Sequence, residues 1–140
     1  MLSLNIKLRV KNLIERCGTR NLFKICKKLN IEVLFMDLGN IKGFYNSAVG
    51  NKFIAINEKL TEWEIKIVLA HELGHALLHC DKTTRFLLDH TKIVRTARQE
   101  KEANEFAAYL LEGILGEERI PEEELFLKRE ILEEIMEYLG

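Results

Sequence analysis

Two histidines of this chain lie four residues apart, with a glutamate directly after the first. His71, Glu72 and His75 form the sequence HELGH. On an α-helix, positions four residues apart share one face and are about one turn, or about 6 Å, apart, so both imidazoles can approach the same ion. Two imidazoles and a neighbouring carboxylate are also the groups with which helices bind zinc and activate a water molecule. The motif therefore predicts one Zn²⁺ ion bound by His71 and His75, with Glu72 as general base.

The alternative for the same residues is a pair of core histidines whose ring nitrogens hydrogen-bond to backbone carbonyls. Two observations favour the metal. A chain of this composition would contain only roughly 0.015 accidental HExxH matches. In addition, a carboxylate at Glu72 in the middle of an apolar helix is costly unless a cation or hydrogen bonds compensate its charge. A bound cation is the natural compensation.

A hydrolytic zinc site has three protein ligands, so a third ligand must follow. His79 would lie about 12 Å from His71 along a continuous helix, too far for both to bind one ion. His90, in a segment without a clear pattern, is a second alternative. Glu100 is the better candidate, because Glu100 and Asn104 share one helix face. The Glu100 carboxylate could bind zinc while the Asn104 amide hydrogen-bonds to a ligand, and we expect His79 to hydrogen-bond to a ligand or to pack beside it.

Small residues predict a close approach of the two helices that carry these groups. Glu102 lies about 200° around its helix from Glu100, so both cannot face one ion. We expect Glu102 and Glu105 to point into solvent. Helices with small side chains between them can approach closely. These small residues are Gly74 on the first helix and Ala103, Ala107 and Ala108 on the second.

Helical spacing is found in residues 1–30, where one apolar stripe ends at Gly18 and a shorter one follows over residues 22–29. The pattern predicts two amphipathic helices with lysines on their polar faces. The first stripe contains Leu4, Leu8, Val10, Leu13 and Ile14.

Three short runs in residues 31–57 favour β-strands, namely IEVLFMDL, KGFYNSAV and KFIAIN. The pairs Gly39-Asn40 and Gly50-Asn51 separate these runs, and both are good turn formers. We therefore expect a small antiparallel sheet.

Residues 61–113 contain the two helices of the site. Thr61 and Glu64 form a capping box before an apolar run that ends at Leu78, and a helix that is apolar all round belongs in the core. The second helix is expected to end at Gly113, and a last, acidic helix is expected over residues 121–139. The fold class is α+β, with the small sheet packed on the HExxH helix and helices flanking both.

The length and composition indicate one domain over residues 1–140. The chain is 47% hydrophobic and 31% charged, which suffices for one compact core. No apolar run approaches the roughly 20 residues of a membrane helix, and the N-terminal stretch lacks a signal peptide. The three cysteines, Cys17, Cys26 and Cys80, are an odd number without CxxC spacing. We therefore expect a cytoplasmic protein that makes no membrane contact.

The net charge of −1 hides an asymmetry. Residues 1–30 contain eight lysines and arginines against one acid, whereas residues 112–140 contain ten glutamates against three basic residues. The basic helices lack interleaved aromatic side chains, so a solvated helix face is the better interpretation and no direct contact with nucleic acid is expected. The acidic segment is expected to cap the fold, with cover of the cleft or docking of a basic partner as alternatives.

The string HELGHALLH, followed about 20 residues later by ExxANxFAAxLL from Glu100 to Leu111, resembles the ImmA/IrrE family of zinc metallopeptidases. The likeness also includes KFIAINEKL and covers roughly residues 30–112. It implies a zincin-like fold of the gluzincin type, with His71, His75 and Glu100 as ligands and Glu72 as general base. It also implies that the substrate is a phage or mobile-element helix-turn-helix repressor, whose cleavage gives derepression. The chain departs from the family in having LLEGILGEERIP where a proline usually follows the leucine pair, and it carries no recognisable helix-turn-helix, so such a partner would be another chain.

The expected reaction is hydrolysis of a peptide bond, in which the oxyanion needs a donor besides zinc. Tyr45, Asn46, Tyr109 and His90 are the candidates. A substrate could add in extended form beside the strand KFIAIN if that strand lies at an edge of the sheet, and the alternative is an inner strand. A different function for the same residues is a zinc-bearing module that sequesters a repressor or an antitoxin-type partner without turnover. Glu72 favours the enzyme, because a binder has no use for a base.

Overall fold

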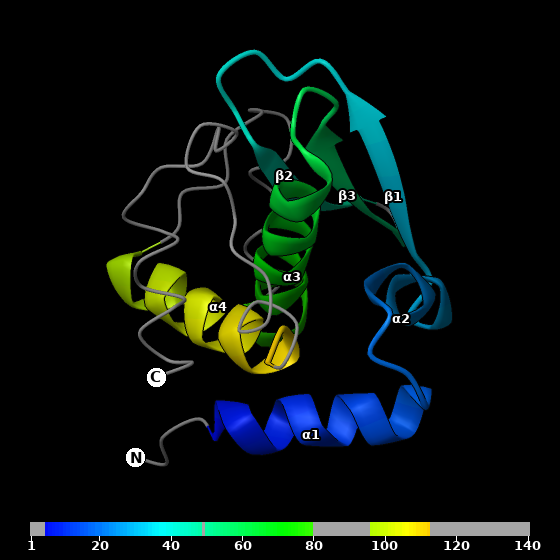
Figure 1. Cartoon of the computed structure of the whole chain (residues 1–140), viewed down its shortest axis with the longest axis vertical. Coiled ribbons are helices and arrows are strands. Elements are labelled where there is room, and N and C mark those ends of the chain that lie inside the picture. Colours follow the sequence, from blue (N-terminus) through cyan, green and yellow to red (C-terminus); the bar gives the residue numbers. More distant parts are fainter. Residues whose placement is uncertain (1–4, 49, 80–95, 113–140) are drawn as a thin grey trace.

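The computed structural model describes residues 5–48, 50–79 and 96–112. In Figure 1, α3 runs down from a small sheet, α4 crosses the lower half of α3, and α1 lies beneath α4. This arrangement confirms the predicted α+β class. The elements in chain order are α1 (Ile6–Cys17), α2 (Leu22–Lys28), β1 (Ile31–Met36), β2 (Gly43–Ala48), β3 (Asn51–Asn57), α3 (Glu62–Leu78) and α4 (Ala97–Leu110).

The first helix has the predicted end but a different buried stripe. Gly18 adopts the left-handed conformation, with φ 68°, and its N–H donates to the carbonyl of Ile14, as is common at helix ends. Leu8, which the sequence placed in the stripe, is 49% exposed. The buried stripe starts at Ile6 instead. The residues that follow Ile6 at spacings of four, three and four lie on a helix face next to the one that contains Leu8. The buried residues are Ile6, Val10, Leu13 and Cys17.

The sheet is mixed, so the prediction of an antiparallel sheet holds for only one of its two pairings. The strand order is β1-β3-β2, with β2 antiparallel to β3 and β1 parallel to it. The loop after β1 passes the end of β3, where the Asn57 amide donates to the carbonyls of Gly39 at 3.0 Å and Ile41 at 2.9 Å. That crossing places β2 on the far side of β3 from β1.

The strand KFIAIN is therefore the central strand β3, with both of its edges paired. Ile54, Ala55 and Ile56 are fully buried, as expected of a strand covered on both faces. The alternative of an inner strand is correct, and an extended substrate cannot add beside it. Among the described residues, the sheet ends in β1 on one side and β2 on the other.

The helix α3 begins at the predicted capping box and lies in the core. The backbone N–H of Glu64 donates to Oγ1 of Thr61 at 3.3 Å, and the N–H of Thr61 donates to Oε1 of Glu64 at 3.0 Å. Residues all around the helix are buried, in agreement with its apolar sequence. The sheet packs on one side of α3 and α4 on another.

We expect Thr61→Ala to lower the free energy of unfolding by about 1 kcal/mol, because it leaves the amide of Glu64 without its acceptor. Urea titration followed by circular dichroism measures this value. Thr61→Ser keeps the hydroxyl and should retain most of the stability. Equal stability of the Ala variant and the wild type would refute the energetic role of this cap.

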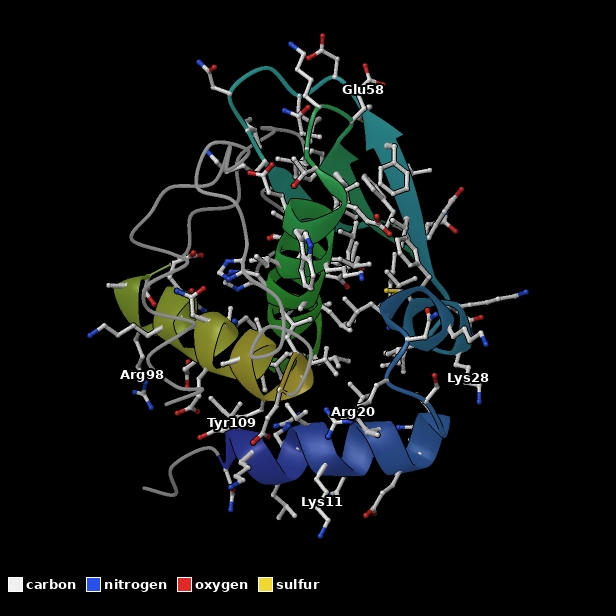
Figure 2. All side chains as sticks on the ribbon, viewed as in Figure 1. Lys11, Arg20, Lys28, Glu58, Arg98 and Tyr109 are labelled. Atoms are coloured by element: carbon white, nitrogen blue, oxygen red, sulfur yellow. The ribbon has the colours of Figure 1, made fainter. Side chains whose placement is uncertain are left out.

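Two arginines of the N-terminal segment bind the carboxyl ends of the helices that carry the motif. Arg9 Nη2 lies 3.4 Å from the carbonyl oxygen of Leu77 at the end of α3, and Arg20 Nη1 lies 3.5 Å from that of Leu110 at the end of α4. Cations at these positions satisfy free carbonyls and interact favourably with the helix dipole. The Nζ of Lys28 likewise donates to the carbonyl of Cys17 at the end of α1, whereas Lys11 projects outward in Figure 2. Part of the basic charge thus stabilises the fold.

Several sequence predictions fall outside the described residues. The helix α4 ends at Leu110, with Leu111 as its C-cap, and the predicted stop at Gly113 lies beyond the described part. The acidic helix over 121–139 and His90 also lie outside it. No helix among the described residues is both long and apolar enough to cross a bilayer.

Candidate metal centre

The three residues predicted as metal ligands come together from two helices. Nε2 of His71 and Nε2 of His75 lie 3.2 Å apart on α3. The Glu100 carboxylate reaches them from α4, with Oε2 3.2 Å from His71 and Oε1 2.9 Å from His75. We call His71, His75 and Glu100 the metal centre.

The spacing of these donors fits a tetrahedral zinc ion. Bonds of 2.0–2.1 Å at tetrahedral angles place neighbouring ligand atoms about 3.3–3.4 Å apart. The 3.2 Å between the Nε2 atoms of His71 and His75 is close to this value, and the Glu100 carboxylate places one oxygen 3.2 Å from His71 and the other 2.9 Å from His75. Two imidazoles and one carboxylate are also a donor set that zinc accepts in hydrolytic sites. The metal centre could therefore fill three of the four coordination positions of a zinc ion.

The metal centre is buried on the side of the histidines and open on the side of the glutamate. The side chains of His71 and His75 are 12% and 2% exposed, whereas that of Glu100 is 43% exposed. Such an arrangement holds the ligands rigidly while leaving one side accessible. A substrate could approach from this side.

The charges of the site favour a cation. Burial alone would raise the pKa of Glu100, but hydrogen bonds from His71 and His75, together with their charge, hold that pKa well below its usual range. Burial would lower the pKa of His71, but the hydrogen bond to Glu100 and the charges of Glu72 and Glu100 raise it. The carboxylate of Glu100 is therefore negative at neutral pH and attracts positive charge.

Glu72 lies beside the donors. It is 8% exposed. Ligand-type atoms of His71, Glu72 and His75 all lie within 4.8 Å of one another. A carboxylate at this position can reach a water molecule next to the metal centre, which is where a general base is needed.

The predicted close approach of α3 and α4 occurs at Gly74. A Cβ atom built there would lie 3.2 Å from Cβ of Phe106 and 3.3 Å from Cα of Ala103. These contacts are tighter than ordinary packing, so a side chain at this position would have to displace α4 by a few tenths of an ångström. The spacing of the two helices sets the reach of Glu100 to the histidines.

We expect Gly74→Ala to weaken zinc binding. The added methyl group would meet the backbone of Ala103, so α4 must shift by a few tenths of an ångström and carry Glu100 with it. The gain in helix propensity of about 1 kcal/mol offsets much of the packing cost, so stability should change little. Competition with a zinc-binding dye measures the affinity. An affinity equal to that of the wild type would show that the spacing is not critical.

Sequence reasoning missed Glu102. Its side chain is 16% exposed, and its Oε1 lies 3.1 Å from Nε2 of His79. The expectation that Glu102 points into solvent was wrong, because His79 lies at the end of α3 and turns toward α4. His79 in turn approaches His75, with 2.9 Å between their Nδ1 atoms. One signal in the sequence could have found Glu102. His79 lies four residues after His75, and a buried histidine needs a hydrogen-bond partner.

The predicted oxyanion donors take different positions. A Cβ atom built at Gly43 would meet the side chain of Val68, so this face of β2 packs on α3. Tyr45 is two residues further along the strand and therefore points to the same face, where it is buried between the sheet and the helix. Asn46 points to the opposite face, and its buried Oδ1 has no hydrogen-bond partner among the described residues.

Tyr109 is not part of the metal centre. Tyr109 comes nine residues after Glu100. It therefore lies on the opposite face of the helix and about 13 Å further along the axis. In Figure 2 it lies at the end of α4 beside α1, and Nζ of Lys7 is 5.9 Å from its ring centroid. Burial and the charges of Glu105 and Glu112 raise its pKa. It is thus a contact between α4 and α1.

Thiol chemistry plays no part in the described site. Cys17 and Cys26 are free and buried. Burial raises the pKa of the Cys26 thiol to about 12, so the reactive thiolate is scarce at neutral pH.

Comparisons with known proteins match these observations. The model of the peptidase M78 family, described as the IrrE N-terminal-like domain, matches residues 26–140. The uncharacterized immunity region protein 2 of Bacillus phage phi105 is 39% identical over 107 residues, which are 76% of this chain and 67% of the phage protein. Metallopeptidase ImmA of Bacillus subtilis strain 168 is 34% identical over 111 residues, which are 78% of this chain and 64% of that protein. The chain thus spans about two thirds of the length of these relatives.

Proposed function

Since the chain belongs to the IrrE N-terminal-like family of metallopeptidases, we propose that it is a zinc-dependent endopeptidase of the gluzincin type. The observation that carries the proposal is the meeting of His71, His75 and Glu100 from two helices, with donor atoms 2.9–3.2 Å apart. In this proposal the three side chains bind one zinc ion. When bound, zinc would polarise the scissile carbonyl and lower the pKa of a water molecule.

Glu72 acts as general base and then as general acid. Its buried carboxylate accepts a proton from the attacking water, whose oxygen forms the new bond to the scissile carbon. The same carboxyl group then donates that proton to the nitrogen of the leaving amine as the peptide bond breaks. Glu72 is 8% exposed, and a charge that is mostly removed from water interacts more strongly with the groups beside it.

The substrate in this proposal is a helix-turn-helix repressor of a phage or mobile element. One relative is named for a phage immunity region and another is named as a metallopeptidase, and both cover most of this chain. Together these names support cleavage of the repressor that maintains immunity. The protein contact, rather than direct contact with DNA, would select the target.

Removal of the metal tests the proposal. We expect wild-type protein treated with a chelator to stop cleaving a purified phage helix-turn-helix repressor, and equimolar zinc to restore the cleavage. Gel electrophoresis and mass spectrometry of the repressor identify the products, and addition of magnesium serves as control. A repressor that is bound but never cleaved would support sequestration without turnover and overturn the endopeptidase.

A further inference from the structure

A row of hydrogen-bonded side chains extends from the metal centre to α4. Nδ1 of His75 lies 2.9 Å from Nδ1 of His79, and Nε2 of His79 lies 3.1 Å from Oε1 of Glu102. All three groups are largely buried, with side-chain exposures of 2%, 5% and 16%. The row ends near Arg98, whose Nε is 3.9 Å from the second oxygen of Glu102 and whose side chain is 73% exposed. Figure 2 shows Arg98 pointing away from the protein.

The direction of each hydrogen bond follows from Glu102. A carboxylate only accepts, so Nε2 of His79 must donate. In a neutral imidazole the other nitrogen then has a lone pair, so Nδ1 of His79 accepts and Nδ1 of His75 donates. In the neutral ring the remaining nitrogen of His75, Nε2, then has no proton, which is the state that a metal ligand needs, whereas in the charged ring it donates to Glu100. The lone pair of the neutral ring faces Oε1 of Glu100 at 2.9 Å and Nε2 of His71 at 3.2 Å, so a cation bound here would be held by this lone pair together with the Glu100 carboxylate.

We propose that Glu102 and His79 are positioning residues that fix the tautomer and ring orientation of His75. This inference rests on the proposed function, because it concerns the same metal centre. In many metal sites a carboxylate or carbonyl directly accepts the other N–H of a ligating histidine. Here a second histidine lies between the ligand and the carboxylate, so α4 supports the metal centre both through Glu100 and, indirectly, through Glu102.

The end of α3 makes this row possible. His79 is the C-cap of the helix, with φ −123° and ψ 22°, and its backbone N–H still donates to the carbonyl of His75 at 2.9 Å. Because His79 leaves the helical conformation, its ring can turn toward both His75 and α4. In a continued helix it would lie one turn beyond His75 and keep the helical direction of its side chain.

The tautomer of His79 in the wild type is the first test. We would label histidine with ¹⁵N, load the whole chain with zinc and record long-range ¹H–¹⁵N spectra, which distinguish the two ring nitrogens of each histidine. The expected result is a proton on Nε2 of His79 and on Nδ1 of His75. A proton on Nδ1 of His79 would overturn the proposal. Simple packing between the helices would not select one tautomer.

Variants of Glu102 provide the second test. We expect Glu102→Leu to raise the Kd for zinc by about 10–100-fold, the usual effect of removing the partner of a ligating histidine. Glu102→Gln keeps an acceptor oxygen and should recover part of the affinity. Glu105→Leu removes a carboxylate from the next turn of α4, outside the row, and should leave the Kd within about twofold of the wild type. Competition with a zinc-binding dye measures all four proteins.

The outcomes separate this inference from the proposed function. Wild-type protein that binds no zinc would refute the metallopeptidase itself. Tight zinc binding by the wild type, with the same Kd in Glu102→Leu, would refute only the positioning role. If Glu102→Leu does not fold, as judged by circular dichroism, the histidine tautomers of the wild type decide the question.

Discussion

Glu72→Gln should lower the rate of repressor cleavage by about 10²–10⁴-fold and leave the affinity for zinc nearly unchanged, the range expected for loss of a general base. The amide has the size of the carboxylate but cannot accept the proton of the attacking water. Glu72 has a ligand-type atom within 4.8 Å of those of His71 and His75, but in the proposed site Glu100, which contacts both histidines, is the third ligand. Single-turnover cleavage of the repressor measures the rate, and a dye competition measures zinc.

The matched control is Glu62→Gln. Glu62 begins α3 and is exposed, so the same chemical change on the same helix should leave the rate unaltered. A Glu72→Gln protein that holds zinc and cleaves at the wild-type rate would remove Glu72 from the mechanism. Another group would then have to act as base.

Glu100→Ala should abolish stable zinc binding and, with it, cleavage. The variant leaves two imidazoles on α3 without the third donor, and loss of a ligand should exceed the roughly 100-fold cost of losing a hydrogen-bond partner of a ligand. It also removes the negative charge that raises the pKa of His71. Zinc titration and the cleavage assay together measure the effect.

Glu112→Ala is the control for Glu100→Ala, because Glu112 is an exposed glutamate just beyond α4. It should bind zinc as the wild type does. Retention of zinc by Glu100→Ala would mean that a different residue supplies the third ligand. The gluzincin assignment would then be wrong.

The helix of the motif could be predicted because its signals are local. The capping box of Thr61 and Glu64 lies three residues apart, and HExxH needs only the helical period to bring His71 and His75 together. Glu100 was harder, since it lies on another helix. The small residues around Gly74 indicated that the two helices meet, which the structure shows.

The neighbours of each strand could not be predicted from the same kind of signal. Alternation and turn residues indicate a strand, but they do not say which strand lies beside it. The parallel pairing of β1 with β3 depends on a loop held by the buried amide of Asn57. A single asparagine at a strand end carries little information before the loop is seen.

Glu102 was misplaced for a related physical reason. A helical wheel gives its direction relative to Glu100 but not the position of a partner at the end of another helix. His79 leaves the helical conformation, so its reach toward α4 is set by tertiary packing. Polar side chains near helix ends are therefore the positions where sequence periodicity is least informative.

The most direct test of the central claim is the zinc content of the purified wild-type chain. After equilibration with micromolar zinc and removal of the free ion, elemental analysis should find one zinc ion per chain. A chain without bound metal would contradict the account, because His71, His75 and Glu100 would then be a hydrogen-bonded cluster rather than the ligands of a catalytic ion.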